Sequence, residues 1–430
     1  MKKHRRITLQ EYGEFIPLEV TQTEVYEIRN NAELWRSSLG LRRTPFAIRK
    51  NTEGQFEVRA EGISGMARIG DIDFEIAPKF LNAQHNEWQV AFWKILAVAN
   101  GGFISNRQMQ ANNSTNQALV DLFAQAFINS CTKGSLRGFP QGYRTTCYKG
   151  PALRGSLDLS QVTHMVARPW EYPCLIDSLS MDTPYASLIK WAAERLTAIV
   201  GSPSMARNLR YVAGTLSFVK TPVPHIVDAR KLRLSAQYRG LEDALNISLM
   251  LLEGSGLSYA VGDKSLSGFL WNTDSVFENL MFWLCDQSSK RNDCKVSKHS
   301  YSFGEVISGS GQKLETIPDV VFKDGTNKVI AIADAKYKVY NDHPVSGDVY
   351  QVFADAHLLG TQKVSLLYPV SDDTACKTWR IDSKLGTKSV YLTMLPINLM
   401  NFARKNGVTE SVSQISSWLR HEHGDNQCTK

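Results

Sequence analysis

The sequence predicts a multi-domain α+β protein with a β-rich N-terminal domain, a mainly helical middle region and a C-terminal α/β domain. Its 430 residues are enough for two or three domains with separate cores. The hydrophobic pattern changes from strand-like to helical near residue 80, and a hairpin signal flanked by helical patterns appears near residue 320. We place a hinge at Gly254-Ser255-Gly256, which gives domains at residues 1–80, 81–256 and 257–430.

The composition is that of an ordinary globular protein, with 43% hydrophobic and 21% charged residues. The net charge of +7 favours a polyanionic partner without requiring one. The seven cysteines include no Cys-x-x-Cys pair, which favours a reduced compartment and excludes a zinc finger. The basic residues at the start of the sequence are followed by a segment that is too polar for the apolar core of a signal peptide. No apolar run approaches the length of a membrane span. We therefore expect a cytoplasmic protein without membrane segments.

The first two regions contain one clear strand and several helical patterns. Apolar and acidic residues alternate over 71–76, which predicts a strand with one buried and one solvent-exposed face that ends before Pro78. Residues 145–160 have an extended pattern. Apolar residues at helical spacing predict helices over 86–99 and 117–131, from Pro184 onward, and over 241–253.

In the C-terminal region, Asp324-Gly325 separates two apolar runs, which predicts a hairpin with strands at 320–322 and 329–333. The second run is almost wholly apolar, as is typical of a central strand covered on both faces. Side chains at positions i and i+2 of a strand share a face, so Asp334 and Lys336 should point the same way. Asp319 begins the partner strand and can reach the same place.

Helical patterns flank this hairpin, and two more strands follow it. A helix is expected at residues 274–285 and another from Asp348, with strands at 363–370 and 389–395. The resulting order of helix, hairpin, helix and strand predicts a compact α/β domain.

Two carboxylates beside a lysine suit a hard divalent cation such as Mg²⁺, with Mn²⁺ as a substitute. The metal would act as a Lewis acid, and Lys336 would orient the attacking water or help to deprotonate it. This set of groups is suited to phosphodiester hydrolysis. The alternative is a hairpin on which Asp334 and Lys336 form an exposed ion pair of little energetic value.

Three further side chains have two interpretations each. Glu278 is either a third carboxylate for the metal or the last residue of a Ser275-x-x-Glu278 capping box. Gln351 either contacts substrate or metal-bound water, or belongs to a solvated helix face. Lys338 shares the face of Lys336 and either adds positive charge there or is simply exposed.

The spacing of Pro318-Asp319 and, 15 residues after Asp319, Asp334-Ala335-Lys336 resembles the core motif of PD-(D/E)XK nucleases. Further segments, in order over roughly residues 60–360, resemble the McrC family, the nuclease subunits of McrBC-type modification-dependent restriction systems. The matching segments are 70–79, 153–157, 179–190, Phe277-Glu278, Pro318-Asp319, Asp334–Lys336 and Tyr350-Gln351. The chain departs from the family at Ser156, where the family's Arg-Gly-Arg/Lys is Arg-Gly-Ser, and before residue 60 it shares only a β-rich character.

This resemblance implies a metal-dependent endonuclease that cleaves double-stranded DNA carrying modified bases. It assigns catalysis to Asp319, Asp334, Lys336 and Gln351, and metal binding to Glu278, Asp319 and Asp334. It also implies a McrB-like AAA+ ring, a GTPase or ATPase, which the N-terminal domain would dock on and stimulate. The chain lacks a Gly-x-x-x-x-Gly-Lys-Ser/Thr loop, so the nucleotide should bind the partner. The alternatives are a non-cleaving adaptor of an AAA+ NTPase and a standalone DNA repair nuclease.

Overall fold

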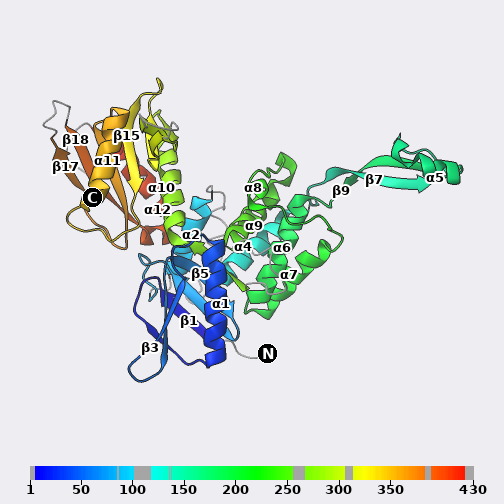
Figure 1. The fold of residues 1–430 in the computed structure, drawn as a ribbon, viewed down its shortest axis with the longest axis horizontal. Coiled ribbons are helices and arrows are strands. Elements are labelled where there is room, and N and C mark those ends of the chain that lie inside the picture. Colours follow the sequence, from blue (N-terminus) through cyan, green and yellow to red (C-terminus); the bar gives the residue numbers. More distant parts are fainter. Residues whose placement is uncertain are drawn as a thin grey trace. The chain divides into compact units, whose positions relative to one another are not determined.

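The computed structural model describes residues 5–84, 87–100, 118–134, 136, 138–254, 267–305, 313–382 and 389–421. Its contacts divide the chain into two compact units, Met1–Leu122 with Gly254–Lys430, and Phe123–Glu253. Helices and several separate sheets occur together, which confirms the expected multi-domain α+β class (Figure 1). The division at residues 80 and 256 stays a prediction, and Ser255-Gly256 of the proposed hinge lies outside the described residues.

The N-terminal part of the first unit contains two small sheets and one long helix. The elements are β1 (Arg5–Gln10), β2 (Ile16–Leu18), α1 (Gln22–Ser38), β3 (Phe46–Lys50), β4 (Phe56–Ala60), β5 (Ile63–Ile69) and β6 (Ile72–Ala77). The sheet order is β2-β4-β3 in one sheet and β1-β6-β5-β10 in the other. The last of these strands, β10 (Ser267–Asn272), comes from far along the chain and pairs with β5.

Helix α1 was not predicted, although its start carries a readable signal. Thr21 and Glu24 form a capping box in which each side chain bonds to the other residue's backbone N–H. Val25, Ile28, Ala32 and Trp35 follow at helical spacing and are buried. The strand predicted at 71–76 is confirmed as β6, but only part of its acidic face is solvent-exposed: Asp71 is exposed and Asp73 half-buried. Glu75 is buried, pairs with Arg6 and accepts a hydrogen bond from Leu119 N at 3.1 Å.

The C-terminal part of the first unit is built on a six-stranded sheet with the order β11-β14-β15-β16-β18-β17. The strands are β11 (Lys295–Ser297), β14 (Val320–Lys323), β15 (Val329–Ala335), β16 (Lys363–Val370), β17 (Lys377–Ile381) and β18 (Val390–Asn398). The hairpin and both later strands are therefore confirmed. Asn327, rather than Gly325, carries the positive φ of the turn, at 66°. A separate hairpin, β12 (Tyr301–Glu305) and β13 (Lys313–Thr316), precedes β14.

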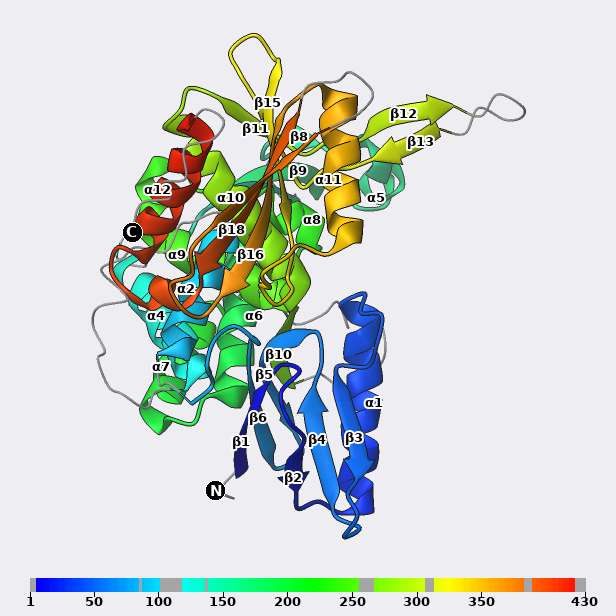
Figure 2. The same ribbon diagram turned by 90° about the vertical axis from the view of Figure 1, so that its left-hand side faces the viewer.

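Helices cover both faces of this sheet (Figure 2). On one face, Val352 and Ala356 of α11 (Ser346–Leu359) pack in a core cluster with Ile332 of β15. On the other, Trp418 of α12 (Gly407–Arg420) packs against Phe322 of β14. Helix α10 (Thr273–Lys290) lies against α12 and the short 3₁₀ helix η4 (Met400–Ala403) precedes α12. Helix α2 (Trp88–Ala99), predicted at 86–99, packs on α10 and η4.

The second unit is a helical group with a β extension. Its helical elements are α5 (Val162–Ala167), α6 (Pro184–Ile199), α7 (Pro203–Thr215), α8 (Ile226–Ala229), α9 (Glu242–Gly254), η2 (Leu159–Gln161) and η3 (Ala236–Leu241), and α4 (Leu119–Gly134) leads into it. Its strands are β7 (Gly142–Gly150), β8 (Ser156–Leu157) and β9 (Tyr172–Ser180). Strands β7 and β9 form a long ribbon with α5 at its far end (Figure 1).

The predicted helix at Pro184 is confirmed, with Pro184 in its first turn and the Thr183 side chain accepting from Ala186 N. The predicted helices at 117–131 and 241–253 correspond to α4 and α9. Across the described ranges, no helix is long and apolar enough to cross a membrane.

Candidate active site

The C-terminal end of β15 brings two predicted carboxylates together. The ladder pairs Val320 of β14 with Ala333 of β15, so Asp319, just before β14, lies beside Asp334. Asp319 Oδ2 accepts a hydrogen bond from the backbone N–H of Ala335 at 3.0 Å, which fixes its position. Asp334 is buried on the face of β15 that carries Ile332 and packs under α11. The expectation that Asp319 reaches this place is confirmed.

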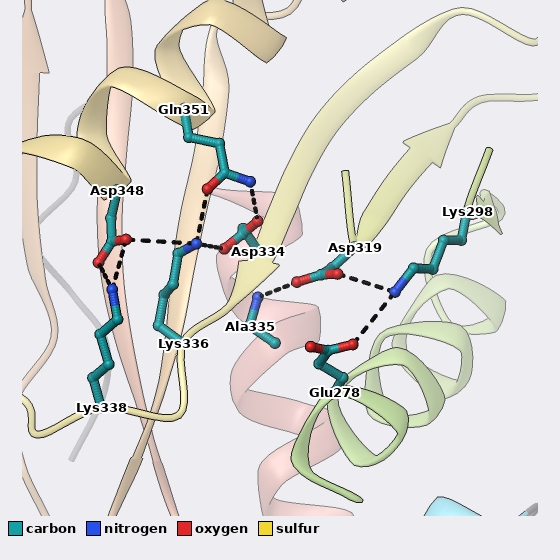
Figure 3. Close-up of polar contacts among 9 residues, drawn as sticks. All are labelled: Glu278, Lys298, Asp319, Asp334, Ala335, Lys336, Lys338, Asp348 and Gln351. Atoms are coloured by element: carbon teal, nitrogen blue, oxygen red, sulfur yellow. Dashed lines mark hydrogen bonds and ion pairs between the residues drawn. The ribbon is translucent and has the colours of Figure 1, made fainter. Parts of the chain in front are cut away.

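Lys336 lies one residue past the end of β15 and points to the same face as Asp334. Its Nζ is 2.6 Å from Asp334 Oδ2, donates to Gln351 Oε1 at 3.0 Å and lies 3.6 Å from Asp348 Oδ1 (Figure 3). Its backbone N–H donates to Leu367 O at 2.8 Å, which continues the ladder to β16. The side chain of Lys336 is only 13% exposed, so the alternative of a solvent-exposed pair with Asp334 is wrong.

Helix α11 supplies Gln351 and Asp348 from its first two turns. The Gln351 amide donates through Nε2 to Asp334 Oδ1 at 3.1 Å and accepts from Lys336 through Oε1. Gln351 is exposed, as the solvated-face interpretation expects, but both ends of its amide also bond to the charged residues. Asp348 is buried and accepts from Lys338 Nζ at 2.9 and 3.0 Å. Lys338 does share the face of Lys336. Asp348 was predicted only as the start of a helix and not as a site residue, although it precedes Gln351 by one helical turn.

Glu278 is linked to Asp319 by Lys298, which was not predicted as a site residue. Helix α10 begins at Thr273, and its N-cap is Asn272, whose side chain accepts from Ser275 N. The capping-box interpretation of Ser275 and Glu278 is therefore wrong, because both residues lie inside the helix. Glu278 Oε2 lies 3.7 Å from Lys298 Nζ, which also donates to Asp319 Oδ1 at 3.0 Å (Figure 3).

The site concentrates negative charge in a largely desolvated place. Burial raises the pKa of Asp334 to about 6; the negative charge of Asp319 contributes, and the nearby Lys336 opposes the shift. Burial and the charge of Asp319 also raise the pKa of Glu278. Burial by itself would lower the pKa of Lys336 and Lys298, but the surrounding carboxylates raise both. Two ammonium groups thus offset carboxylates that would otherwise repel one another.

The carboxylates of the site can be compared with the ligands that a divalent cation needs. Within the ranges that the structure describes, no three His, Cys, Asp or Glu side chains form a group that could hold a metal. The buried Asp334 Oδ2 nevertheless lacks a hydrogen-bond partner there, although the Lys336 ammonium lies beside it. Mg²⁺ usually takes one or two carboxylates and completes its shell with water and phosphate. Asp319 and Asp334 fit that requirement as a pair, and Lys298 shows that a cation is accommodated between Asp319 and Glu278.

Comparisons with known proteins agree on one group. Residues 58–369 match the model of a family described as the McrBC 5-methylcytosine restriction system component. The fold is similar to a chain in the refined half-complex from the tetradecameric assembly of Thermococcus gammatolerans McrB AAA+ hexamers with bound McrC. That match has a TM-score of 0.60 and 14% identity, and covers 95% of this chain and 100% of that chain. A cryo-EM structure of the Thermococcus gammatolerans McrBC complex matches with a TM-score of 0.48 and 14% identity, covering 66% and 88%. No curated protein matches the chain.

Proposed function

Since this chain belongs to the family of McrBC 5-methylcytosine restriction system components, we propose that it is the DNA endonuclease subunit of such a system. The observation that carries the proposal is the group of Asp319, Asp334 and Lys336 at the end of β15. A buried carboxylate with a second, half-buried carboxylate and an ammonium beside it is costly to maintain unless the charges are used. The C-terminal sheet with α10 and α11 is proposed to be a PD-(D/E)XK nuclease domain.

In this proposal, Asp319 and Asp334 would hold a Mg²⁺ ion, for which Mn²⁺ can substitute. Glu278, which lies near the Lys298 ammonium as Asp319 does, would add a third carboxylate. The ion would supply Lewis-acid chemistry at a DNA phosphate. The chain's own residues orient the reactants. The Lys336 ammonium is held between Asp334, Gln351 and Asp348, from where it offsets charge on the phosphate and orients the attacking water. Gln351 fixes both Asp334 and Lys336, and Lys338 adds positive charge beside them.

A partner completes the proposed machine. The similar solved assembly contains McrB AAA+ hexamers with bound McrC, and we propose an equivalent AAA+ ring, a GTPase or ATPase, for this chain. The chain would dock on the ring through its N-terminal domain and stimulate its nucleotide hydrolysis. Since the family is described by 5-methylcytosine restriction, double-stranded DNA with that base is the proposed substrate. Contacts from this chain would then be to the DNA backbone, with the modified base sensed by the partner.

The test is cleavage of 5-methylcytosine-containing and unmodified plasmid DNA by the chain with its co-purifying partner in Mg²⁺. The proposal expects cleavage of the modified plasmid and loss of cleavage in Asp334→Ala, with the partner's nucleotide hydrolysis still stimulated. Asp342→Ala, in an exposed pair with Lys377, serves as the control and should cleave normally. If neither wild type nor variant cleaves while both stimulate hydrolysis, the chain is an adaptor and the endonuclease proposal is wrong. Cleavage by the chain without any partner would instead indicate a standalone nuclease.

A further inference from the structure

Tyr337, the residue directly after Lys336, is tied to the N-terminal part of the first unit. Its hydroxyl donates to Glu11 Oε2 at 2.6 Å, and its carbonyl oxygen accepts from Lys79 Nζ at 2.7 Å. Its ring packs edge-on against Phe80 and lies 5.5 Å from the ring of Phe277 in α10. Two residues more than 250 positions away in the sequence thus hold Tyr337 beside the candidate site, one through its side chain and one through its backbone.

Glu11 and Lys79 form one connected network rather than two separate contacts. The backbone N–H of Lys79 donates to Glu11 Oε2 at 3.1 Å, the same oxygen that accepts from Tyr337. The Lys79 ammonium lies 4.1 Å from the centre of the Tyr337 ring, which suits a cation–π contact. Glu11 is 1% exposed. Lys79 is half-buried. Burying a carboxylate beside a half-buried ammonium seldom adds stability over apolar residues of the same size, so the network calls for another explanation.

The position of Tyr337 explains what the network controls. Strand β15 ends at Ala335, so Lys336 and Lys338 lie beyond the regular ladder, on either side of Tyr337. The backbone of this segment continues with a hydrogen bond from Lys338 N to Lys336 O at 2.7 Å. A shift of Tyr337 would therefore move both lysine side chains relative to Asp334 and Asp348. A displacement of about 1 Å in a catalytic group can cost roughly 100-fold in rate.

We infer that Glu11 and Lys79 are positioning residues for Lys336, acting through Tyr337, so that the N-terminal β region completes the nuclease site. This inference rests on the proposed function and deepens it, because it makes the geometry of the cleavage site depend on the region proposed to dock on the partner. Both residues contact Tyr337 rather than Lys336 itself: Glu11 accepts from its side-chain hydroxyl, and Lys79 donates to its carbonyl oxygen.

Lys79→Met tests the inference against a matched control. Lys94 in α2 is also largely buried, and its Nζ donates to the carbonyl oxygens of Ala403 and Arg404 at 2.9 and 3.0 Å. Lys94→Met therefore removes the same kind of lysine-to-carbonyl contact, but at the carbonyls of Ala403 and Arg404 instead of Tyr337. We expect Lys79→Met to lower kcat for DNA cleavage about 10-fold with an unchanged KM, and Lys79→Arg to recover part of the loss. Lys94→Met should change kcat less than about 2-fold.

A second pair of variants changes little volume. Tyr337→Phe removes the hydroxyl that donates to Glu11 but keeps the ring in place, and Tyr340→Phe removes a hydroxyl that donates to Ala375 O. We expect only Tyr337→Phe to lower kcat. Equal kcat values for Lys79→Met and Lys94→Met, together with a normal kcat for Tyr337→Phe, would overturn the inference and leave the proposed nuclease intact.

A measurement independent of cleavage separates this inference from the proposed function. The acylation rate of Lys336 by an amine-reactive reagent, followed by peptide mass spectrometry, reports how well its largely buried side chain is held. We expect Lys79→Met to acylate Lys336 several-fold faster than wild type or Lys94→Met does. If wild type fails to cleave any DNA with its partner, the proposed function is wrong and the labelling rates alone decide the inference. Identical labelling in all three proteins would refute it.

Discussion

Gln351 and Asp334, 17 residues apart in the chain, are joined by a 3.1 Å hydrogen bond from Gln351 Nε2 to Asp334 Oδ1. The same amide accepts from the Lys336 ammonium through its oxygen, so one neutral side chain contacts both the carboxylate and the ammonium (Figure 3). Because an amide has a donor end and an acceptor end, this arrangement fixes the relative orientation of Asp334 and Lys336.

Gln351→Ala should lower DNA cleavage about 10- to 100-fold, because outer partners of metal ligands are typically worth that much. The helix itself should remain, since alanine is a strong helix former. Gln362→Ala is the control, because Gln362 also donates from its side-chain amide, but to the backbone oxygen of Ser389 instead of to Asp334. Cleavage rates and thermal melting of both variants check the prediction, which is wrong if the two lose activity equally.

Asp319→Asn should lower cleavage by at least about 100-fold, because a ligand is lost as well as a charge. The Asn side chain keeps an oxygen that can accept from Ala335 N, so the loop before β14 should stay in place. Single-turnover cleavage of modified plasmid measures the loss. Partner nucleotide hydrolysis, measured in the same samples, should stay at the wild-type level, and a parallel fall in both would indicate misfolding.

Lys298→Met should strengthen the binding of a divalent cation. The Lys298 ammonium lies between Glu278 and Asp319, and its side chain is 41% exposed. An exposed pair of this kind is worth about 0.2–1 kcal/mol, so its removal should lower the Mg²⁺ concentration for half-maximal cleavage roughly 1.4- to 5-fold. Titration calorimetry with Mn²⁺, without DNA, gives a second measure. Weaker metal binding in Lys298→Met would show that this lysine supports the site instead of competing for it.

Stability should fall as pH rises from about 5 to 7 because of Glu11. Burial raises the pKa of Glu11 from 4.5 to about 7, although Tyr337 and Lys79 oppose the shift. Between these values the folded protein holds a proton that the unfolded chain has released, so the stabilising contribution is complete below 4.5 and is lost as pH rises through 7. The slope cannot exceed about 1.4 kcal/mol per pH unit for one group.

Urea unfolding of wild type and Glu11→Gln at several pH values measures this slope. Glutamine keeps an acceptor for Tyr337 but cannot titrate, so the difference between the two proteins isolates the contribution of Glu11. The difference should shrink or reverse toward high pH. A difference that does not change with pH would contradict the assignment.

The sequence alone determined the local features of the site. Alternation along a strand is a property of a few neighbouring residues, so the shared face of Asp334 and Lys336 could be predicted without the fold. The hairpin before them and the helix entry at Pro184 also follow from short-range backbone preferences. The family resemblance rested on motifs that occur in the expected order along the chain. The match over residues 58–369 confirms it.

Only the tertiary structure decided what surrounds these residues. Period and propensity tell which face of an element is apolar, but they do not tell which distant element covers it. The contacts of Lys298 with Glu278 and Asp319, and of Tyr337 with Glu11 and Lys79, join segments 20 to 326 positions apart. The same limit explains why the burial of Glu75 was not predicted. Its place in the alternating pattern suggests the solvent-exposed face, but it is buried, pairs with Arg6 and accepts a hydrogen bond from Leu119 N. A charge pattern read locally cannot reveal such partners, because chain folding brings them together through contacts that no short window contains.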